Sequence, residues 1–217
     1  GYIADSVKPL QYLLTPELIS SLLKPRSPDA HKGDTGHLLV IAGSPGKTGA
    51  AAMTAISAMR AGAGLVTLGI PASLNSILEV QVIEPMTHPL PESRDGILNE
   101  SSFNNIMDLL SDKKCLTIGP GLGSAKETKT LVHRIIQEST KPIVIDADGL
   151  NSLIGHTEIL KNLNVPVILT PHPGEMAGLL NTTSGDVQKD RIVCSRNFAK
   201  KYNTHVVLRG AGTVIAH

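Results

Sequence analysis

The 217-residue sequence contains only two cysteines, Cys115 and Cys194, which lie far apart and form no CxxC pair. A disulfide framework or a structural zinc site needs closely spaced cysteines, so the pattern favours neither. Aromatic residues make up 2% of the chain, and tryptophan is absent. Proteins that bind single-stranded nucleic acid stack bases on aromatic side chains, and this composition offers few such platforms. We therefore expect an aliphatic core.

Neither charge dominates the chain. The chain has 20 Lys and Arg residues and 19 Asp and Glu residues, which gives a net charge of +1. No basic block could neutralise many phosphates, so we expect no nucleic-acid partner. No apolar stretch approaches the roughly 18 residues of a membrane span, and the start GYIADSVK lacks the regions of a signal peptide. These features predict a protein of the reducing cytoplasm without a membrane partner.

Five short apolar runs each lead directly into small, charged or imidazole-bearing residues. They are LLVIAGSPGKTGAA from Leu38, CLTIGPGLG from Cys115, PIVIDADGLN from Pro142, PVILTPHPGE from Pro166 and VVLRGAGT from Val206. Short apolar runs in which apolar and polar residues do not alternate are typical of strands buried on both faces. The helical stretches between these runs predict a parallel sheet of α/β class. Ligands of such sheets bind outside the carboxyl ends of the strands, where these polar residues lie.

The chain is expected to form one α/β domain over residues 31–217, because no Ser/Gly-rich or charged linker divides it. Residues 1–30 form a lead-in segment with one short helix, capped by Thr15 and with Pro16 at its first position. Further helices are predicted over the following ranges: Gly49 to Ala61, Leu74 to Val80, Asn99 to Leu110, Ala125 to Glu138 and Asp186 to Tyr202.

Two glycine-rich turns are candidate ligand loops. GSPGKTG follows a strand and opens a helix, but a P-loop requires a glycine where Ile41 stands, so Lys47 is not a Walker lysine. Free N–H groups at the start of that helix could still bind an anion, and a merely tight turn is the alternative. GPGLG, from Gly119 to Gly123, lacks the GxGxxG spacing and could serve only to turn the backbone sharply.

Carboxylates and a histidine follow the next two strands. Asp146 and Asp148 would point to the same face of an extended backbone and could hold Mg²⁺ through water. We favour a helix-capping role for Asp148 and a functional role for Asp146. In TPHPGE two prolines fix the backbone around His172, and Glu175 begins a helix whose dipole favours its carboxylate; a structural histidine is the alternative.

HKGD, from His31 to Asp34, precedes the first strand. It should therefore lie at the opposite end of the sheet, unless the lead-in segment folds over. A solvated charged turn is the alternative to a functional role.

Six segments together resemble the NAD(P)H-hydrate dehydratase family, in order from about Leu13 to Ala216. They are HKGDTGHLLVIAGS, TGAAAMTAISAMRAGAGLVTL, IGPGLG, PIVIDADGLN, ILTPHPGE and VVLRGAGTVIA. The resemblance implies a ribokinase-like three-layer sandwich around a mostly parallel sheet. It also implies repair of NAD(P)H that has added water to the nicotinamide ring, by phosphorylation of the ring hydroxyl and loss of phosphate. The second segment is similar to bacterial members, which implies ADP rather than ATP as phosphoryl donor, with Mg²⁺, and a homo-oligomer such as a tetramer.

The resemblance also implies roles for particular residues. Ala50, Gly121 and His172 match positions that hold the hydrated dinucleotide, and Glu175 resembles the acidic residue that positions Mg²⁺ in ribokinase-like sites. Asp146, from the carboxylate pair, is the second candidate for the metal. The segment that would contact the adenine nucleotide consists of Arg209, Gly210, Ala211, Gly212 and Thr213. Arg209 stands where the family usually has Lys. The planar guanidinium keeps the positive charge of the compact Lys ammonium but has a different shape, so the affinity for the nucleotide is expected to differ.

The family's catalytic aspartate, in a GTGD segment at a helix N-terminus, has no counterpart in this sequence. Gly33 to Asp34 and Gly185 to Asp186 lack the flanking glycines. We therefore expect a dehydratase domain that is truncated at its C-terminus. The start, GYIADSVKPLQYLLTPE, resembles the junction after an N-terminal epimerase domain. The alternatives are a ribokinase-like kinase of a small vitamin-precursor alcohol and a non-catalytic nucleotide-binding module.

Residues 1–217 alone are expected to show no dehydratase turnover, because phosphoryl transfer to an alcohol needs a base that this sequence does not provide at the expected motif. The measurement is the return of the near-ultraviolet absorbance of reduced nicotinamide after purified NAD(P)H hydrate is mixed with ADP or ATP. Detectable return with this polypeptide would contradict the expectation.

Overall fold

The computed structural model describes residues 11–23, 25, 27, 29, 31 and 33–217, and the chain divides into two compact units, Gly1–His31 and Lys32–His217. The first ten residues of the lead-in segment and Lys32 of HKGD lie outside the described residues. The first unit contains α1 (Pro16–Ser20). Thr15 accepts a hydrogen bond from the Leu18 N–H at 3.4 Å, and Pro16 occupies the first helical position, which confirms the predicted helix start.

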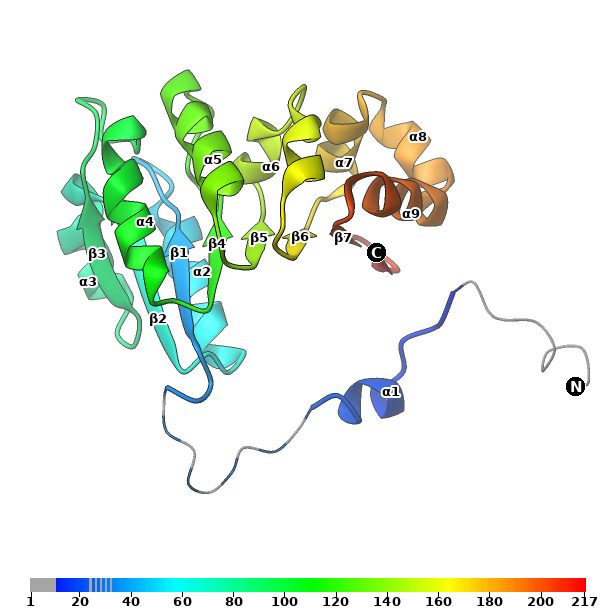
Figure 1. Cartoon of the computed structure of the whole chain (residues 1–217), viewed down its shortest axis with the longest axis horizontal. Coiled ribbons are helices and arrows are strands. Elements are labelled where there is room, and N and C mark those ends of the chain that lie inside the picture. Colours follow the sequence, from blue (N-terminus) through cyan, green and yellow to red (C-terminus); the bar gives the residue numbers. More distant parts are fainter. Residues whose placement is uncertain (1–10, 24, 26, 28, 30, 32) are drawn as a thin grey trace, which may run out of the picture. The chain divides into compact units, whose positions relative to one another are not determined.

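The second unit is built on one eight-stranded sheet in the order β3-β2-β1-β4-β5-β6-β7-β8 (Figure 1). The strands are β1 (His37–Ile41), β2 (Leu65–Pro71), β3 (Met86–Leu90), β4 (Cys115–Ile118), β5 (Ile143–Ile145), β6 (Val167–Leu169), β7 (His205–Leu208) and β8 (Val214–Ala216). All neighbours pair in parallel except β7 and β8, which are antiparallel. The predicted mostly parallel sheet is confirmed.

Helices cover the sheet and connect its strands. They are α2 (Thr48–Arg60), α3 (Asn75–Gln81), α4 (Phe103–Ser111), α5 (Lys126–Glu138), α6 (Asp148–Ser152), α7 (Pro173–Leu180), α8 (Ser184–Lys189) and α9 (Arg191–Tyr202), with 3₁₀ turns η2 (Ala72–Leu74), η3 (Glu100–Ser102) and η4 (Thr157–Asn162). No helix in the described ranges is both long and apolar enough to cross a membrane.

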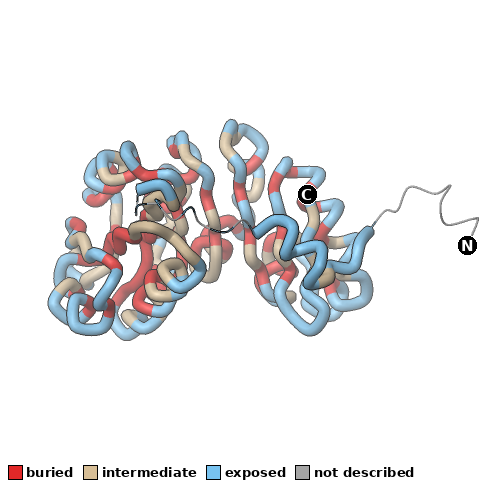
Figure 2. The backbone as a smooth tube through the Cα atoms, turned by 90° about the horizontal axis from the view of Figure 1, so that it is seen from below, coloured by how far each residue is buried: buried red, intermediate tan, exposed pale blue. Residues whose placement is uncertain are grey.

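Two buried apolar clusters lie on opposite faces of the sheet, and alternate residues of β1 contribute to each. Val40 and Ala42 pack in the cluster that includes α2 and α3, whereas Leu39 and Ile41 pack in the cluster that includes α4, α5, α6, α7 and α9. Side chains alternate between the faces of a strand, so β1 is covered on both sides. Figure 2 shows the buried backbone in the interior of this unit and the exposed backbone along its helices. Around β1 and β2 the arrangement is therefore a three-layer sandwich.

The strand order reverses direction between β1 and β4. The chain runs outward from β1 to β2 and β3, then returns and runs the other way from β4 to β7. Right-handed crossovers place the helices of the two halves on opposite faces. In open α/β sheets ligands bind outside the carboxyl ends of the strands next to such a switch point, which here lies between β1 and β4.

Burial on both faces was expected for every apolar run, and this is wrong for the second half of the sheet. β1 and β2 end in fully buried residues, but Ile168 of β6 and Ile215 of β8 are exposed and Val144 of β5 is half-buried. These residues alternate with buried neighbours that pack under α5 to α9. The reason is that α2 and α3 pack over β1 and β2, and no helix of the described chain buries the same face of β5 to β8.

Two further predictions of local structure were wrong. The predicted helix from Asp186 to Tyr202 is two helices, because the non-helical Asp190 separates α8 from α9 and caps α9 by accepting from the Val193 N–H at 2.9 Å. Strand β3 was not predicted. Its Pro89 cannot donate a ladder hydrogen bond, which is tolerated because β3 is an edge strand.

Gly119 is the point at which three strand ends meet. Its N–H donates to the carbonyl of Ile41 at the end of β1, at 3.2 Å. A Cβ placed on Gly119 would lie 1.9 Å from the carbonyl oxygen of Asp146, beyond the end of β5, and its φ is +126°. Only a residue without a side chain allows the loops after β1, β4 and β5 to approach this closely.

Gly119→Ala is expected to lower the free energy of unfolding by about 3 kcal/mol or more, because backbone strain and a backbone clash add together. Gly155→Ala is the matched control: Gly155 also has a positive φ, of +79°, but open space where its Cβ would stand. The control should lose only about 1–2 kcal/mol. Urea unfolding of both variants measures this, and equal losses would contradict the role of Gly119.

Candidate functional site

The polar residues singled out in the sequence lie in the loops after β1, β4, β5, β6 and β7. These strands are parallel neighbours, so their carboxyl ends form one edge of the sheet. Gly33 and Asp34 of HKGD lie instead in the turn that enters β1, at its amino end, as predicted. The expected site is therefore assembled at one edge, without these two residues.

The turn after β1 and the loop after β4 are joined by hydrogen bonds. The buried Ser44 hydroxyl donates to the carbonyl of Gly121 at 2.8 Å, and the Gly43 N–H donates to the carbonyl of Pro120 at 2.9 Å. A Cβ on Gly121 would lie 3.0 Å from the Cβ of Ala50, in the first turn of α2. Ala50 and Gly121, which are far apart in sequence, thus border the same small space.

Asp148 holds three loops together. Its Oδ2 accepts from the Nζ of Lys47 at 2.9 Å and from the Gly123 N–H at 2.8 Å. The predicted capping role is wrong: Asp148 is the first residue of α6, the N-cap is Ala147, and no side chain caps the helix. Burial alone would raise the pKa of Asp148, but the hydrogen bonds from Lys47 and Gly123 outweigh burial and hold the pKa below its ordinary value.

The backbone at Ala147 directs the two aspartates to different partners. Ala147 has φ +50° and ψ −120°, a conformation that residues with a Cβ rarely adopt. Strand β5 has ended at Ile145, so the extended geometry that would aim both carboxylates at one face is absent. Asp148 turns to Lys47, whereas Asp146 turns to Arg209 at 3.2 Å. The prediction that the pair shares a face is therefore wrong.

His172 and Glu175 form a capping box at the start of α7. The Nδ1 atom of His172 accepts from the N–H groups of Gly174 and Glu175, at 3.0 and 3.3 Å, so this nitrogen carries no proton. The Oε2 atom of Glu175 accepts from the His172 N–H at 2.8 Å. The imidazole therefore has a structural role; its side chain is 55% exposed, and its Nε2 lies 3.5 Å from Oε1 of Glu175.

Arg209, which follows the last residue of β7, forms hydrogen bonds to the loops after β5 and β6. Its Nη2 atom lies 3.2 Å from Oδ1 of Asp146 and 3.3 Å from Oε2 of Glu175, and its Nε donates to the Thr170 carbonyl at 2.6 Å. Two carboxylates thus converge on one cationic nitrogen. No group of three or more potential metal-ligating side chains occurs among the residues that the structure describes.

The structure brings together two groups of predicted residues rather than one. Ala50 and Gly121 lie beside the loops after β1 and β4, whereas Asp146, His172, Glu175 and Arg209 surround the ends of β5 to β7. Strands β4 and β6 are separated by β5, so the two groups are about 10 Å apart along the sheet edge. An elongated ligand could contact both.

Known proteins match this chain in sequence over most of its length. The family model described as NAD(P)H-hydrate dehydratase matches residues 38–217. A bifunctional NAD(P)H-hydrate repair enzyme from Moorella thermoacetica is 41% identical over 204 residues, which is 94% of this chain and 38% of that protein. The Escherichia coli enzyme of the same name is 36% identical over 92% of this chain and 36% of its own length.

The chain belongs to the NAD(P)H-hydrate dehydratase family.

Solved structures agree with this membership. An ADP/ATP-dependent NAD(P)H-hydrate dehydratase from Bacillus subtilis, co-crystallised with ATP and Mg²⁺, matches with a TM-score of 0.75 and 27% identity, over 93% of this chain and 68% of that one. A ribokinase-like protein from Enterococcus faecalis matches with a TM-score of 0.79 and 19% identity, over 97% of this chain and 72% of its own. The predicted ribokinase-like fold is confirmed. The dehydratase-family chain spans less than two fifths of the bifunctional relatives named above.

Sequence reasoning missed three residues that hold the loops of the candidate site together. Ser44 and Arg191 were not singled out, and Lys47 was considered only as a failed P-loop lysine. Arg191 reaches from α9 to the carbonyls of Leu208, Arg209 and Ala211. No sequence motif predicts the contacts of these three residues, because each contact joins segments that are distant in sequence and adjacent only in the folded chain.

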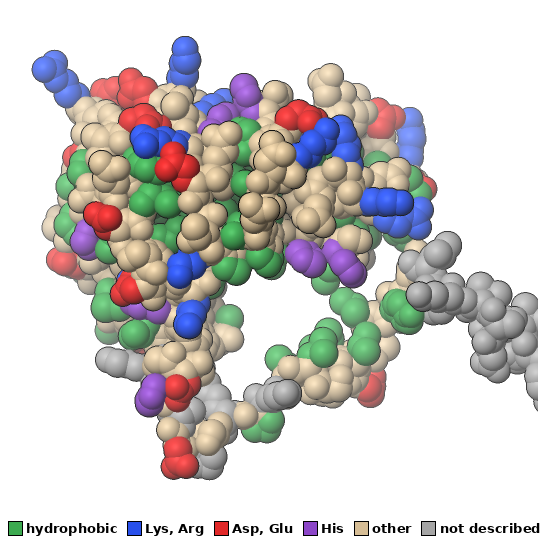
Figure 3. Space-filling view, viewed as in Figure 1, with side chains coloured by type: hydrophobic (Ala, Val, Ile, Leu, Met, Phe, Trp, Pro, Cys, Tyr) green, Lys and Arg blue, Asp and Glu red, His purple; other side chains and the backbone are tan. Residues whose placement is uncertain are grey.

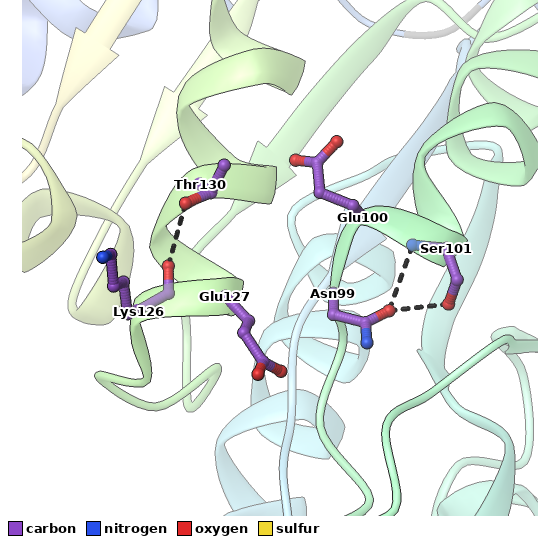
Figure 4. A pocket seen from close by; sticks show the side chains of 6 residues that line it. All are labelled: Asn99, Glu100, Ser101, Lys126, Glu127 and Thr130. Carbon is purple, nitrogen blue, oxygen red and sulfur yellow. Dashed lines mark hydrogen bonds between the residues drawn. The ribbon is translucent and has the colours of Figure 1, made fainter.

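A pocket of about 280 Å³ lies between η3 and the N-terminal part of α5 (Figure 4). It is lined by Asn99, Glu100, Ser101, Lys126, Glu127 and Thr130. None of these was predicted as a site residue. Asn99 accepts from the Ser101 N–H at 3.0 Å as the N-cap of η3, and the Thr130 hydroxyl donates to the Lys126 carbonyl at 3.1 Å within α5.

Asp148→Asn is expected to lower the free energy of unfolding at neutral pH by about 1–2 kcal/mol, since charged hydrogen bonds to Lys47 and Gly123 are lost. The folded-state pKa of Asp148 is lowered, so its stabilisation is fully present above the unfolded pKa of about 4 and is lost as pH falls through the folded pKa. The difference between wild type and variant should therefore shrink in acid. Chemical unfolding at several pH values measures it, and a pH-independent difference would contradict the ion pair.

Proposed function

We propose that this protein carries out nucleotide-dependent dehydration of the S epimer of hydrated NADH or NADPH. The observation that carries the proposal is the convergence, at one sheet edge, of the residues that resemble the family's dinucleotide and nucleotide positions. The nucleotide supplies a phosphoryl group to the ring hydroxyl, which then leaves as phosphate. What the chain contributes is binding, orientation and charge.

The hydrated dinucleotide is proposed to lie along the loops after β1, β4 and β6. At Ala50 and Gly121 the dinucleotide could come close to the protein backbone, since neither residue has a side chain that would fill the space between them. The Nε2 of the half-exposed His172 side chain, 3.5 Å from Oε1 of Glu175, is proposed to donate to an oxygen of the dinucleotide, because Nδ1 is held as an acceptor by the cap of α7. The rigid capping box thus fixes the direction of the donor.

The adenine nucleotide is proposed to bind the connection between β7 and β8, which runs from Arg209 to Thr213. ADP is the proposed donor, on the similarity to bacterial members; the Bacillus subtilis relative was co-crystallised with ATP and Mg²⁺. Asp146 and Glu175 suit Mg²⁺, because both are oxygen donors and both already direct an oxygen at a single cationic atom. The remaining ligands would be water and phosphate oxygens.

The domain is proposed to continue beyond His217 in the parent protein and to contain its catalytic aspartate there. The exposed Ile168 and Ile215 support this, because a further helical layer would bury them. An epimerase domain is proposed before the lead-in segment, in line with the bifunctional relatives. We also propose a cytoplasmic homo-oligomer, such as a tetramer, as the family resemblance implies.

The test is the return of reduced-nicotinamide absorbance from purified NAD(P)H hydrate with ADP or ATP, using protein from the complete parent reading frame. Arg209→Met should raise the KM for the nucleotide about tenfold, because a charged contact at the phosphates is worth about 1–2 kcal/mol. Arg60→Met is the matched control, since Arg60 is exposed in the last turn of α2, at the opposite end of the sheet.

Absence of turnover with either nucleotide, from a folded protein, would contradict the dehydratase proposal. Phosphorylation of a small vitamin-precursor alcohol in the same assay series would then favour the kinase. Turnover with an unchanged KM in Arg209→Met would leave the reaction standing and contradict the nucleotide position.

A further inference from the structure

One side chain, that of Arg191, forms hydrogen bonds to the backbone of the connection between β7 and β8. Arg191, the first residue of α9, donates from Nη1 to the Ala211 carbonyl at 2.8 Å and from Nη2 to the Leu208 and Arg209 carbonyls at 2.9 and 3.2 Å. The carbonyl of the last residue of β7 and two carbonyls of the connection therefore point toward a single guanidinium. The planar fork suits this task, because its donors diverge at fixed angles.

The orientation of these carbonyls determines where the next N–H groups point. In a trans peptide the C=O of one residue and the N–H of the next lie in one plane and point in opposite directions, and the described chain has no cis peptide bond. With the Arg209 and Ala211 carbonyls turned to Arg191, the N–H groups of Gly210 and Gly212 point away from it. Neither N–H makes a hydrogen bond within the described chain.

A pair of free N–H groups in a glycine-rich turn is typical of an anion-binding concavity. Both residues have positive φ, of +144° at Gly210 and +66° at Gly212, so the turn presents backbone rather than side chains. The Arg209 side chain leaves the same turn toward Asp146 and Glu175, which links the turn to the rest of the site.

We propose that Arg191 is a positioning residue for nucleotide binding: it fixes the β7–β8 connection so that the N–H groups of Gly210 and Gly212 donate to phosphate oxygens of the adenine nucleotide. This inference rests on the proposed function, and it adds a residue outside the RGAGT segment itself. Arg191 acts through backbone geometry and does not contact the nucleotide.

The experiment is calorimetric titration of ADP with Mg²⁺ into the purified protein from the complete parent reading frame, in four versions: wild type, Arg191→Met, Arg191→Lys and Arg196→Met. Arg196 is exposed on the same helix and is the control for loss of one positive charge. Arg191→Lys keeps the charge but loses the fork. Misfolding lowers the binding stoichiometry but not the Kd of the molecules that remain folded, so the Kd isolates the positioning role.

We expect the Kd of Arg191→Met to rise about tenfold or more, equivalent to about 1.4 kcal/mol, at near-normal stoichiometry. Arg191→Lys should be intermediate, weakened about threefold, and Arg196→Met should stay within about twofold of wild type. If Arg191→Met does not fold, the Kd of Arg191→Lys decides in the same way.

Two results would overturn the inference. A wild-type Kd in Arg191→Met, or in Arg191→Lys if that variant alone folds, would refute the positioning role while the nucleotide assignment stands. Failure of the wild-type protein to bind ADP or ATP would refute both the assignment of Arg209–Thr213 and the inference built on it.

Discussion

The candidate site depends on how closely the loops after β1, β4 and β5 approach one another, and this is limited by Gly119. Because Gly119 has no side chain, the loop after β4 can pass against the carbonyl of Asp146. Ser44, Lys47 and Asp148 then tie the same loops with hydrogen bonds whose donors and acceptors come from all three. The carboxyl ends of β1, β4 and β5, beside the switch point, are thus held in place by closely packed backbone and hydrogen bonds.

Charge is distributed over the site by two arginines with different tasks. Arg209 brings its cationic fork to two carboxylates at the strand ends, whereas Arg191 turns its fork to backbone carbonyls. The contacts of Arg209 place positive and negative charge next to the proposed phosphate and metal positions. The contacts of Arg191 orient the peptide groups of the β7–β8 connection. Elsewhere, on the face shown in Figure 3, acidic and basic side chains are interspersed, as expected from a net charge of +1.

Much of the fold could be read from local patterns, and particular failures show the limit. The runs near Leu38 and Pro166 predicted strands because apolar content is a property of the segment itself, and the parallel sheet followed from helices between them. Asp148 was predicted as a cap because its position before a helix is visible in the sequence, whereas its actual partners, Lys47 and Gly123, are remote. Strand β3 was missed because Pro89 weakens the pattern, and only its position at the sheet edge makes Pro89 acceptable.

By itself the sequence determined the family, the α/β class and the edge of the sheet at which the polar residues gather, because motif order and strand polarity are encoded locally. Only the tertiary structure decided which of those residues meet: Ala50 with Gly121, and Arg209 with Asp146 and Glu175. It also decided that Ile168 and Ile215 are exposed, and that Arg191 holds the β7–β8 connection. Side-chain contacts between distant segments depend on strand order and backbone approach, which no local pattern contains.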